Sequence, residues 1–187
     1  KNPNNPNDPN SNNEHCESVV REFIYIKKLE VALIFDRTKS VITEDQTKTS
    51  LVHVQNQPVL TATNEYTVVN GDYEAIIHTL LPTQMNLSLI DERLVTGETP
   101  REDEAFRLQI ENTDTGVVHF LNVIQAKGLN EAKATVNLID SGNSYTVIIS
   151  DPIKGNAVVE LQKGQYSQGG RIGCNPVSIP TTLDPLN

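Results

Sequence analysis

Apolar and polar residues alternate along most of this chain in short runs, which is the pattern that half-buried β-strands produce. The first alternation begins at Val19, and a nearly continuous apolar run from Val31 to Phe35 follows the polar pair Lys27 and Lys28. These two segments predict a pair of strands. Nine further strands are predicted at residues 50–54, 66–69, 73–80, 86–90, 106–110, 117–126, 134–139, 145–150 and 157–161.

Turn-forming residues separate the predicted strands. Residues 70–72, 114–116, 141–143 and 154–156 each contain a glycine, which tolerates the positive φ that tight hairpins need. Eleven strands with short connections and no intervening helical period favour antiparallel pairing over a parallel sheet with crossover helices. The sequence therefore predicts an all-β fold, an antiparallel β-sandwich.

Composition divides the chain into three parts. The first thirteen residues, KNPNNPNDPNSNN, have no apolar side chain except proline, so they cannot bury enough surface to offset the entropy lost on ordering. Residues 1–18 are predicted to be a disordered-looking Asn/Pro-rich arm or linker, and residues 19–163 the sandwich domain. Residues 164–187 are rich in glycine and proline, and we expect an irregular tail there.

The charge of the chain excludes two classes of partner. Lys and Arg number 15 against 24 Asp and Glu, a net charge of −9, whereas nucleic acids and anionic lipids require a basic face. No run approaches the roughly 18 apolar residues of a membrane-spanning helix. We expect neither a nucleic-acid nor a membrane partner. The same charge weighs against this segment alone binding a polyanionic sugar.

The two cysteines, Cys16 and Cys174, lie just outside the first and last clear apolar segments. Strands that close a sandwich could bring these positions together, so we predict a disulfide, and two unpaired thiols are the alternative. A bridge favours a secreted or extracellular protein, the periplasm included. A first residue of Lys fits either a mature chain after signal cleavage or a fragment of a longer protein.

Residue types that carry chemistry are present but do not form a recognisable motif. The four histidines, at positions 15, 53, 78 and 119, lack the spacing of metal ligands, and no nucleophile elbow or phosphate-binding loop occurs. The acidic groups at 91–92 and 102–104 lie in polar connections, where charge keeps a loop solvated. We therefore predict no catalytic residues, no cofactor and no metal. Asn86, in Asn-Leu-Ser, matches the acceptor pattern for N-glycosylation.

Residues 21–27 (REFIYIK) and 31–37 (VALIFDR) form two predicted strands, the second of which ends in an Asp-Arg pair. They resemble paired strands in the C-terminal β-sandwich region of heparinase II/III-like polysaccharide lyases. Asp36 and Arg37 are then either a structural pair that caps a sheet edge or two separate exposed charges. The similarity continues, in the order of the family, at residues 48–53 with Pro58, 79–82, 106–110 and 119–125.

The resemblance implies a part of an enzyme and not a complete one. In that family the catalytic groups come mainly from a helical toroid before the β region, and its catalytic His and Tyr match no residue of this sequence. Our first hypothesis is a non-catalytic sandwich that supports or shapes a polysaccharide cleft beside a missing N-terminal catalytic domain. The alternative is an extracellular structural or filament subunit, a homo-oligomer that self-associates through its N-terminal arm.

Overall fold

The structure is a computed structural model that describes residues 16–41, 47–94, 105–167 and 170–175. Within these ranges the chain is almost entirely β-structure, which confirms the predicted all-β class. One 3₁₀ turn, η1 (Glu92–Leu94), interrupts the strands. The strands are β1 (Cys16–Ile26), β2 (Val31–Ser40), β3 (Lys48–Val54), β4 (Val59–Ala62), β5 (Glu65–Asn70), β6 (Tyr73–Leu81), β7 (Asn86–Asp91), β8 (Phe106–Asn112), β9 (Val118–Gly128), β10 (Thr135–Asp140), β11 (Ser144–Asp151), β12 (Gly155–Gln162) and β13 (Gly170–Asn175).

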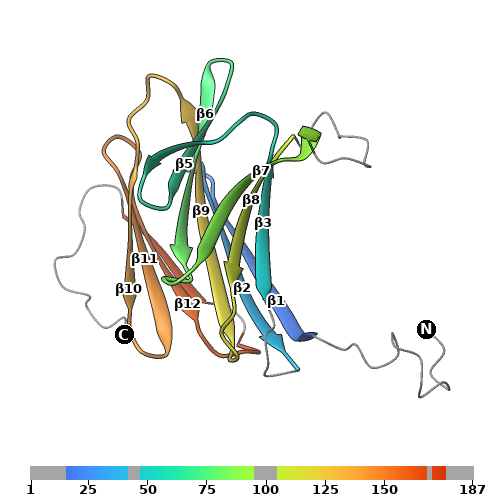
Figure 1. Ribbon diagram of the computed structural model, residues 1–187. Helices are drawn as coiled ribbons and strands as arrows, with labels where there is room; N and C mark the ends of the chain where they lie inside the picture. The colour runs from blue at the N-terminus through green and yellow to red at the C-terminus, as the bar shows by residue number, and fades with distance from the viewer. Residues whose placement is uncertain (1–15, 42–46, 95–104, 168–169, 176–187) are drawn as a thin grey trace.

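These strands form three antiparallel sheets. The central sheet has the order β1-β2-β9-β6-β5-β4, the four-stranded sheet has the order β10-β11-β12-β13, and the three-stranded sheet has the order β3-β8-β7. Figure 1 shows the central sheet between the other two. The sandwich therefore has three layers, because each face of the central sheet is partly covered by one of the smaller sheets.

Burial on both faces explains the continuous apolar runs of the central sheet. In β9, Leu121 and Val123 pack against the four-stranded sheet, whereas Phe120 and Ile124 pack toward the three-stranded sheet. The outer layers alternate instead, as in β12, where Ala157, Val159 and Leu161 point inward and the residues between them do not. A strand that is buried on both faces needs apolar residues at successive positions, whereas an outer strand needs them at every second one.

All eleven predicted strands are present, and the structure adds two. The short β4 is fully exposed, so it lacks the apolar alternation on which the sequence prediction depends. The strand β13 lies inside the segment predicted to be an irregular tail, and it pairs only with β12 at the edge of its sheet. At Gly170 a β-carbon would collide with the carbonyl oxygen of Glu160, so a residue that breaks other strands is required in this one.

The boundaries of the predicted arm and tail are only partly covered by the described residues. The strand β1 begins at Cys16, which is inside the segment predicted as an arm, and it pairs with β2 from there to Ile26. Residues 1–15 and 176–187 lie outside the described ranges.

Candidate functional site

A polar cleft of about 400 Å³ opens between the central sheet and the beginning of β10. This volume falls within the range of small-molecule sites, roughly 300 to 1,000 Å³. The polar cleft, as named here, is lined by Thr63, Asn64, Glu65, His78, Thr79, Leu80, Lys133, Ala134, Thr135 and Val136.

The register of β5, β6 and β9 determines which side chains form the floor of the cleft. His78 of β6 is opposite Val123 of β9 on one side and opposite Glu65 of β5 on the other, so all three side chains share one face of the central sheet. Val123 lies in the core beneath the four-stranded sheet. That core includes no residue of β4 or β5, so the same face becomes polar and open from His78 outward.

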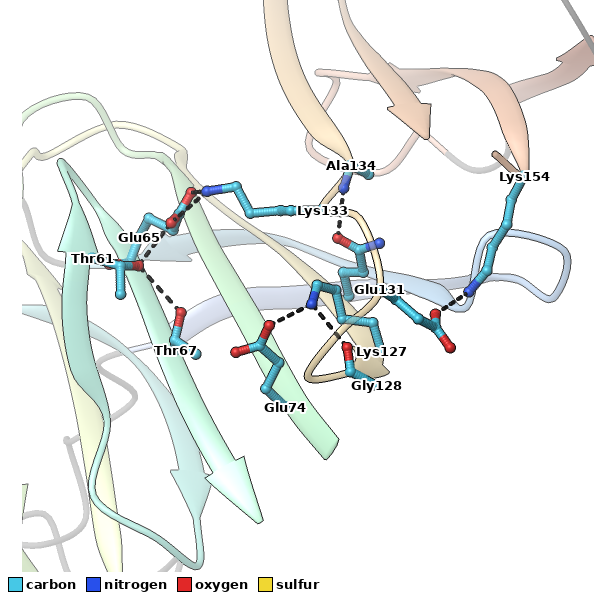
Figure 2. A network of polar contacts seen from close by, with 11 residues as sticks. Thr61, Glu65, Thr67, Glu74, Lys127, Gly128, Glu131, Lys133, Ala134 and Lys154 are labelled. Carbon is cyan, nitrogen blue, oxygen red and sulfur yellow. Dashed lines mark hydrogen bonds and ion pairs between the residues drawn. The ribbon is translucent and has the colours of Figure 1, made fainter. Parts of the chain in front are cut away.

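A buried carboxylate is the central group of the cleft. Glu65 accepts hydrogen bonds from Lys133 Nζ at 2.8 and 2.7 Å, one to each carboxylate oxygen, and from the Thr61 hydroxyl at 2.7 Å. Lys133 reaches Glu65 from the segment before β10, so the pair connects two sheets (Figure 2). Burial opposes ionisation of Glu65, but the bonds from Lys133 and Thr61 outweigh it and hold its pKa below the ordinary value.

His78 lies beside this carboxylate in the cleft. Its Nδ1 is 3.5 Å from the Glu65 carboxylate, and its Nε2 is buried without a hydrogen-bond partner in the described structure. Burial lowers the pKa of His78, although the neighbouring Glu65 acts in the opposite direction. The imidazole is therefore mainly neutral at pH 7, and it retains one nitrogen that no protein group satisfies.

Two further groups of charges adjoin the cleft on the same side of the molecule. Lys127 donates to Glu74 and to the backbone oxygen of Gly128. Lys154 is shared between Glu30 and Glu131. Figure 2 shows the contact of Lys127 with Glu74 on the central sheet and the contact of Lys154 with Glu131. Each ammonium group in this region is held by at least one carboxylate, so none is free to attract an anion.

The other described histidines have separate surroundings. His119 has its two ring nitrogens near Tyr145 Oη at 3.1 Å and the backbone oxygen of Lys163 at 3.0 Å, and burial lowers its pKa. His53 is 3.7 Å from Glu92 near the far edge of the three-stranded sheet. The three described histidines are thus not brought together, and His15 lies outside the described residues.

Asp36 and Arg37 are both buried, and their side chains point to opposite faces of the central sheet. Asp36 receives a two-pronged bond from Arg21 of β1, with both distances 2.7 Å. Arg37 points to the other face, where it donates to Glu22 and to the backbone oxygens of Gln162 and Ser167. The two residues therefore do not pair with each other and are not exposed charges. Asp36 connects β2 to β1, and Arg37 connects β2 both to β1 and to the four-stranded sheet.

The structure shows no bond between the two cysteines. Cys16 is opposite Ser40 in the central sheet, Cys174 is opposite Ala157 in the four-stranded sheet, and both are free and exposed. Arg37 anchors the Gln162 end of β12 near the start of β1, whereas Ala157 is roughly 17 Å farther along at the usual rise per residue. A disulfide requires α-carbons within about 7 Å, so the predicted bridge has no support from the fold.

The remaining predicted positions are surface features. Asn86, the predicted glycosylation acceptor, is exposed at the start of β7. Asp91 and Glu92 are held by Arg93 and Arg107, and the second acidic group, 102–104, lies outside the described residues. Among residues that the structure describes, no group of three or more potential ligands could hold a metal ion. The described part of the chain also has no helix long and apolar enough to cross a membrane.

Sequence reasoning named His78 only among four histidines without a recognisable motif, and it missed Glu65 and Lys133, which give the cleft its charge. Glu65 begins a strand directly after the Asn64 turn, and Lys133 stands in a connection. A carboxylate in a turn and a lysine in a loop are typical solvated residues. They are separated by 68 positions, and only the folding of β10 toward β5 brings them together.

Comparison with known proteins gives a relationship at the level of fold. No protein-family model matches the chain, and no curated protein sequence matches it. The fold is similar to that of the heparan sulfate lyase HepC from Pedobacter heparinus, with a TM-score of 0.53 and 15% sequence identity. The similarity covers 79% of this chain and 24% of the lyase chain. This chain therefore spans about a quarter of the length of that lyase, and the likeness supports the predicted resemblance as a shared fold.

Proposed function

We propose that this chain is a non-catalytic β-sandwich module of a secreted carbohydrate-degrading protein, and that its polar cleft forms part of the carbohydrate-binding surface. The observation that carries this proposal is the similarity of four-fifths of the chain to one quarter of a polysaccharide lyase. A match of that kind is typical of a module that works with further domains.

The contacts of the titratable groups favour a binding role over a catalytic one. Glu65 is occupied by Lys133 and Thr61, and both nitrogens of His119 have partners. The Nε2 atom of His78 is enclosed, so a substrate proton would have no direct path to it. A general base must reach the proton that it removes within about 3 Å. The cleft instead offers hydroxyl, amide and charged groups at its surface, as sugar binding requires.

The first experiment asks whether the isolated chain binds sugars and whether it cleaves them. Binding is measured by NMR titration of the ¹⁵N-labelled chain with a panel of oligosaccharides, and lyase activity by the ultraviolet absorbance of unsaturated sugar ends. We expect shifts at cleft residues such as Asn64 and Thr135, and no growth of absorbance. Binding without cleavage supports the proposal, whereas cleavage by the isolated chain contradicts the non-catalytic role.

An exposed apolar strip on β1 supports the need for a companion domain. Val19, Phe23 and Tyr25 point from the same face of β1 and are 60%, 65% and 56% exposed. The three-stranded sheet covers this face of the central sheet farther along, over β9, β6 and β5. Exposed apolar patches mark interaction surfaces. Because the matched lyase chain is about four times as long as the matched region, we assign the strip to a companion domain of the same protein.

The alternative function, a self-associating extracellular subunit, predicts a different occupant for this strip. Light scattering coupled to size exclusion measures the mass of the isolated chain, with a variant that lacks residues 1–13 as the comparison. A companion domain predicts a monomer for both forms. An oligomer that dissociates when the arm is deleted would favour the structural subunit, and one that persists until Phe23 is replaced by Ser would assign the strip to a second copy.

A further inference from the structure

The polar cleft has a donor and acceptor pattern that suits sugar hydroxyl groups. Lys133 supplies N–H donors, Glu65 supplies acceptors, and the hydroxyls of Thr63 and Thr135 can act as either. A sugar hydroxyl also donates one hydrogen bond and accepts others, so it can satisfy both kinds of group at once. Sulfate and carboxylate groups only accept, and they would meet the Glu65 carboxylate without a hydrogen to offer it.

The charges around the cleft oppose an acidic ligand. The ammonium of Lys133 is already bound to both oxygens of Glu65. The adjoining groups are Glu74 with Lys127 and Glu131 with Lys154 (Figure 2), and Lys154 also pairs with Glu30. Four carboxylates thus face three ammonium groups, which leaves one excess negative charge on a chain whose net charge is −9. This excess negative charge would repel a polyanion, just as a basic groove would attract one.

The apolar part of the lining also limits the ligand. Leu80, Ala134 and Val136 can contact the C–H face of a sugar ring, but among the described residues no Phe, Tyr or Trp lines the cleft. Large aromatic side chains supply much of the binding energy where they occur, so a lining without Phe, Tyr or Trp predicts weak binding.

We propose that the polar cleft binds uncharged sugar residues through Glu65 and Lys133 and discriminates against sulfated and uronate sugars. This inference rests on the proposed carbohydrate role and specifies its ligand class. In this proposal, sugar hydroxyl groups hydrogen-bond to both the Lys133 ammonium and the Glu65 carboxylate. Glu65 accepts hydrogen bonds from the hydroxyl groups and repels anions. The ligand class therefore differs from the heparan sulfate named for the structural neighbour.

The experiment compares neutral and acidic oligosaccharides of equal length. The full chain is titrated by NMR with uncharged oligomers of glucose, mannose and N-acetylglucosamine, and separately with heparan sulfate and polyuronate oligomers. We expect shifts at Asn64, Lys133 and Thr135 with at least one neutral sugar, and at least about tenfold weaker binding of the acidic sugars at low salt.

The variant Glu65→Gln tests the assigned residue, because it keeps the side-chain shape and removes the charge. It frees the Lys133 ammonium, so binding of acidic oligomers should strengthen relative to neutral ones. Glu111→Gln is the matched control, since it makes the same change in net charge on the three-stranded sheet, away from the cleft. A thermal melt of each variant checks that it is folded.

Each outcome separates this inference from the proposed function. Tighter binding of heparan sulfate than of neutral sugars overturns the ligand class and leaves a carbohydrate module. Neutral-sugar shifts away from the cleft, or equal effects of the two variants, overturn the assigned site. Binding of none of the sugars overturns the carbohydrate role itself.

Discussion

The two free ends of the central sheet contain the same charge arrangement in different surroundings. At the β1 end, the buried side chain of Asp36 is 6% exposed and is held by Arg21, which is 58% exposed. At the β4–β5 end, Glu65 is 9% exposed and is held by Lys133, which is 44% exposed. In both cases a buried carboxylate is neutralised by a cation that reaches it from the solvent side.

What surrounds each pair differs, because the smaller sheets cover opposite faces of the central sheet. The three-stranded sheet leaves its face open at the β1 end, and the four-stranded sheet leaves the opposite face open at the β4–β5 end. The exposed residues at these two ends differ in kind. Beside Arg21 they are Val19, Phe23 and Tyr25, whereas beside Lys133 they are threonines, Asn64 and His78. The comparison teaches that the same kind of ion pair can lie beside an exposed apolar surface at one end of a sheet and beside a polar cleft at the other. The residues that neighbour each pair, and not the pair itself, give the two ends their different character.

The largest effect is expected from removing the cation at the β1 end. Arg21→Ala leaves the Asp36 carboxylate buried without its two hydrogen bonds, which should cost about 2 to 3 kcal/mol of unfolding free energy. Lys133→Ala is the matched change and should cost about 1 kcal/mol, since Glu65 keeps Thr61 and opens to the cleft. Urea denaturation of both variants measures the difference. Equal losses would show that the two ends are energetically alike.

A smaller effect is expected from acidification, and it should come partly from the cleft. Burial lowers the pKa of His78 below 6.5, so the unfolded chain binds a proton that the folded chain resists. Stability is complete above about pH 6.5 and should fall below it, by at most about 1.4 kcal/mol per pH unit for one group. Thermal melts from pH 8 to pH 5 test this.

Substitution separates the histidines that contribute to this loss. His78→Gln should flatten the decrease between pH 7 and pH 5, and His119→Gln should remove the remainder, because burial lowers that pKa as well. The pKa of Glu65 is also depressed, so its contribution is lost only below its ordinary value of 4.5. Unchanged slopes in both variants would exclude the histidines as the source.

The smallest effect on stability is expected in the apolar strip. Phe23→Ser should change the unfolding free energy by no more than about 0.5 kcal/mol, because the ring is mostly exposed and fills no part of a core. Val19→Ser should behave in the same way. Urea denaturation checks both. A loss of 2 kcal/mol or more would mean that the ring is packed within the isolated chain, and the strip would then be no docking surface.

Much of the fold was predictable because strands and turns depend on residues that are close together in the sequence. Alternation located the outer strands, and continuous apolar runs located strands such as Val31–Phe35 in β2 and the buried part of β9. Glycine also marked the hairpins correctly, as at Gly71 and Gly142, where φ is positive. The apolar runs predict only strands, and the three-layer arrangement comes from the structure. The strand β13 was missed because glycine in a sequence indicates a break in a strand, whereas Gly170 is required by the close approach of the Glu160 carbonyl of β12.

The sequence by itself determined the strands, the turns and the acidic balance, since each depends on residues that are near neighbours in the chain. Only the tertiary structure decided which charges meet. Lys133 and Glu65, or Arg37 and Ser167, are brought together only by the way the sheets pack on one another. It also placed Cys16 and Cys174 in different sheets without a bond between them. Sequence spacing contains no information on such distances, because they depend on how the sheets stack and where each one ends.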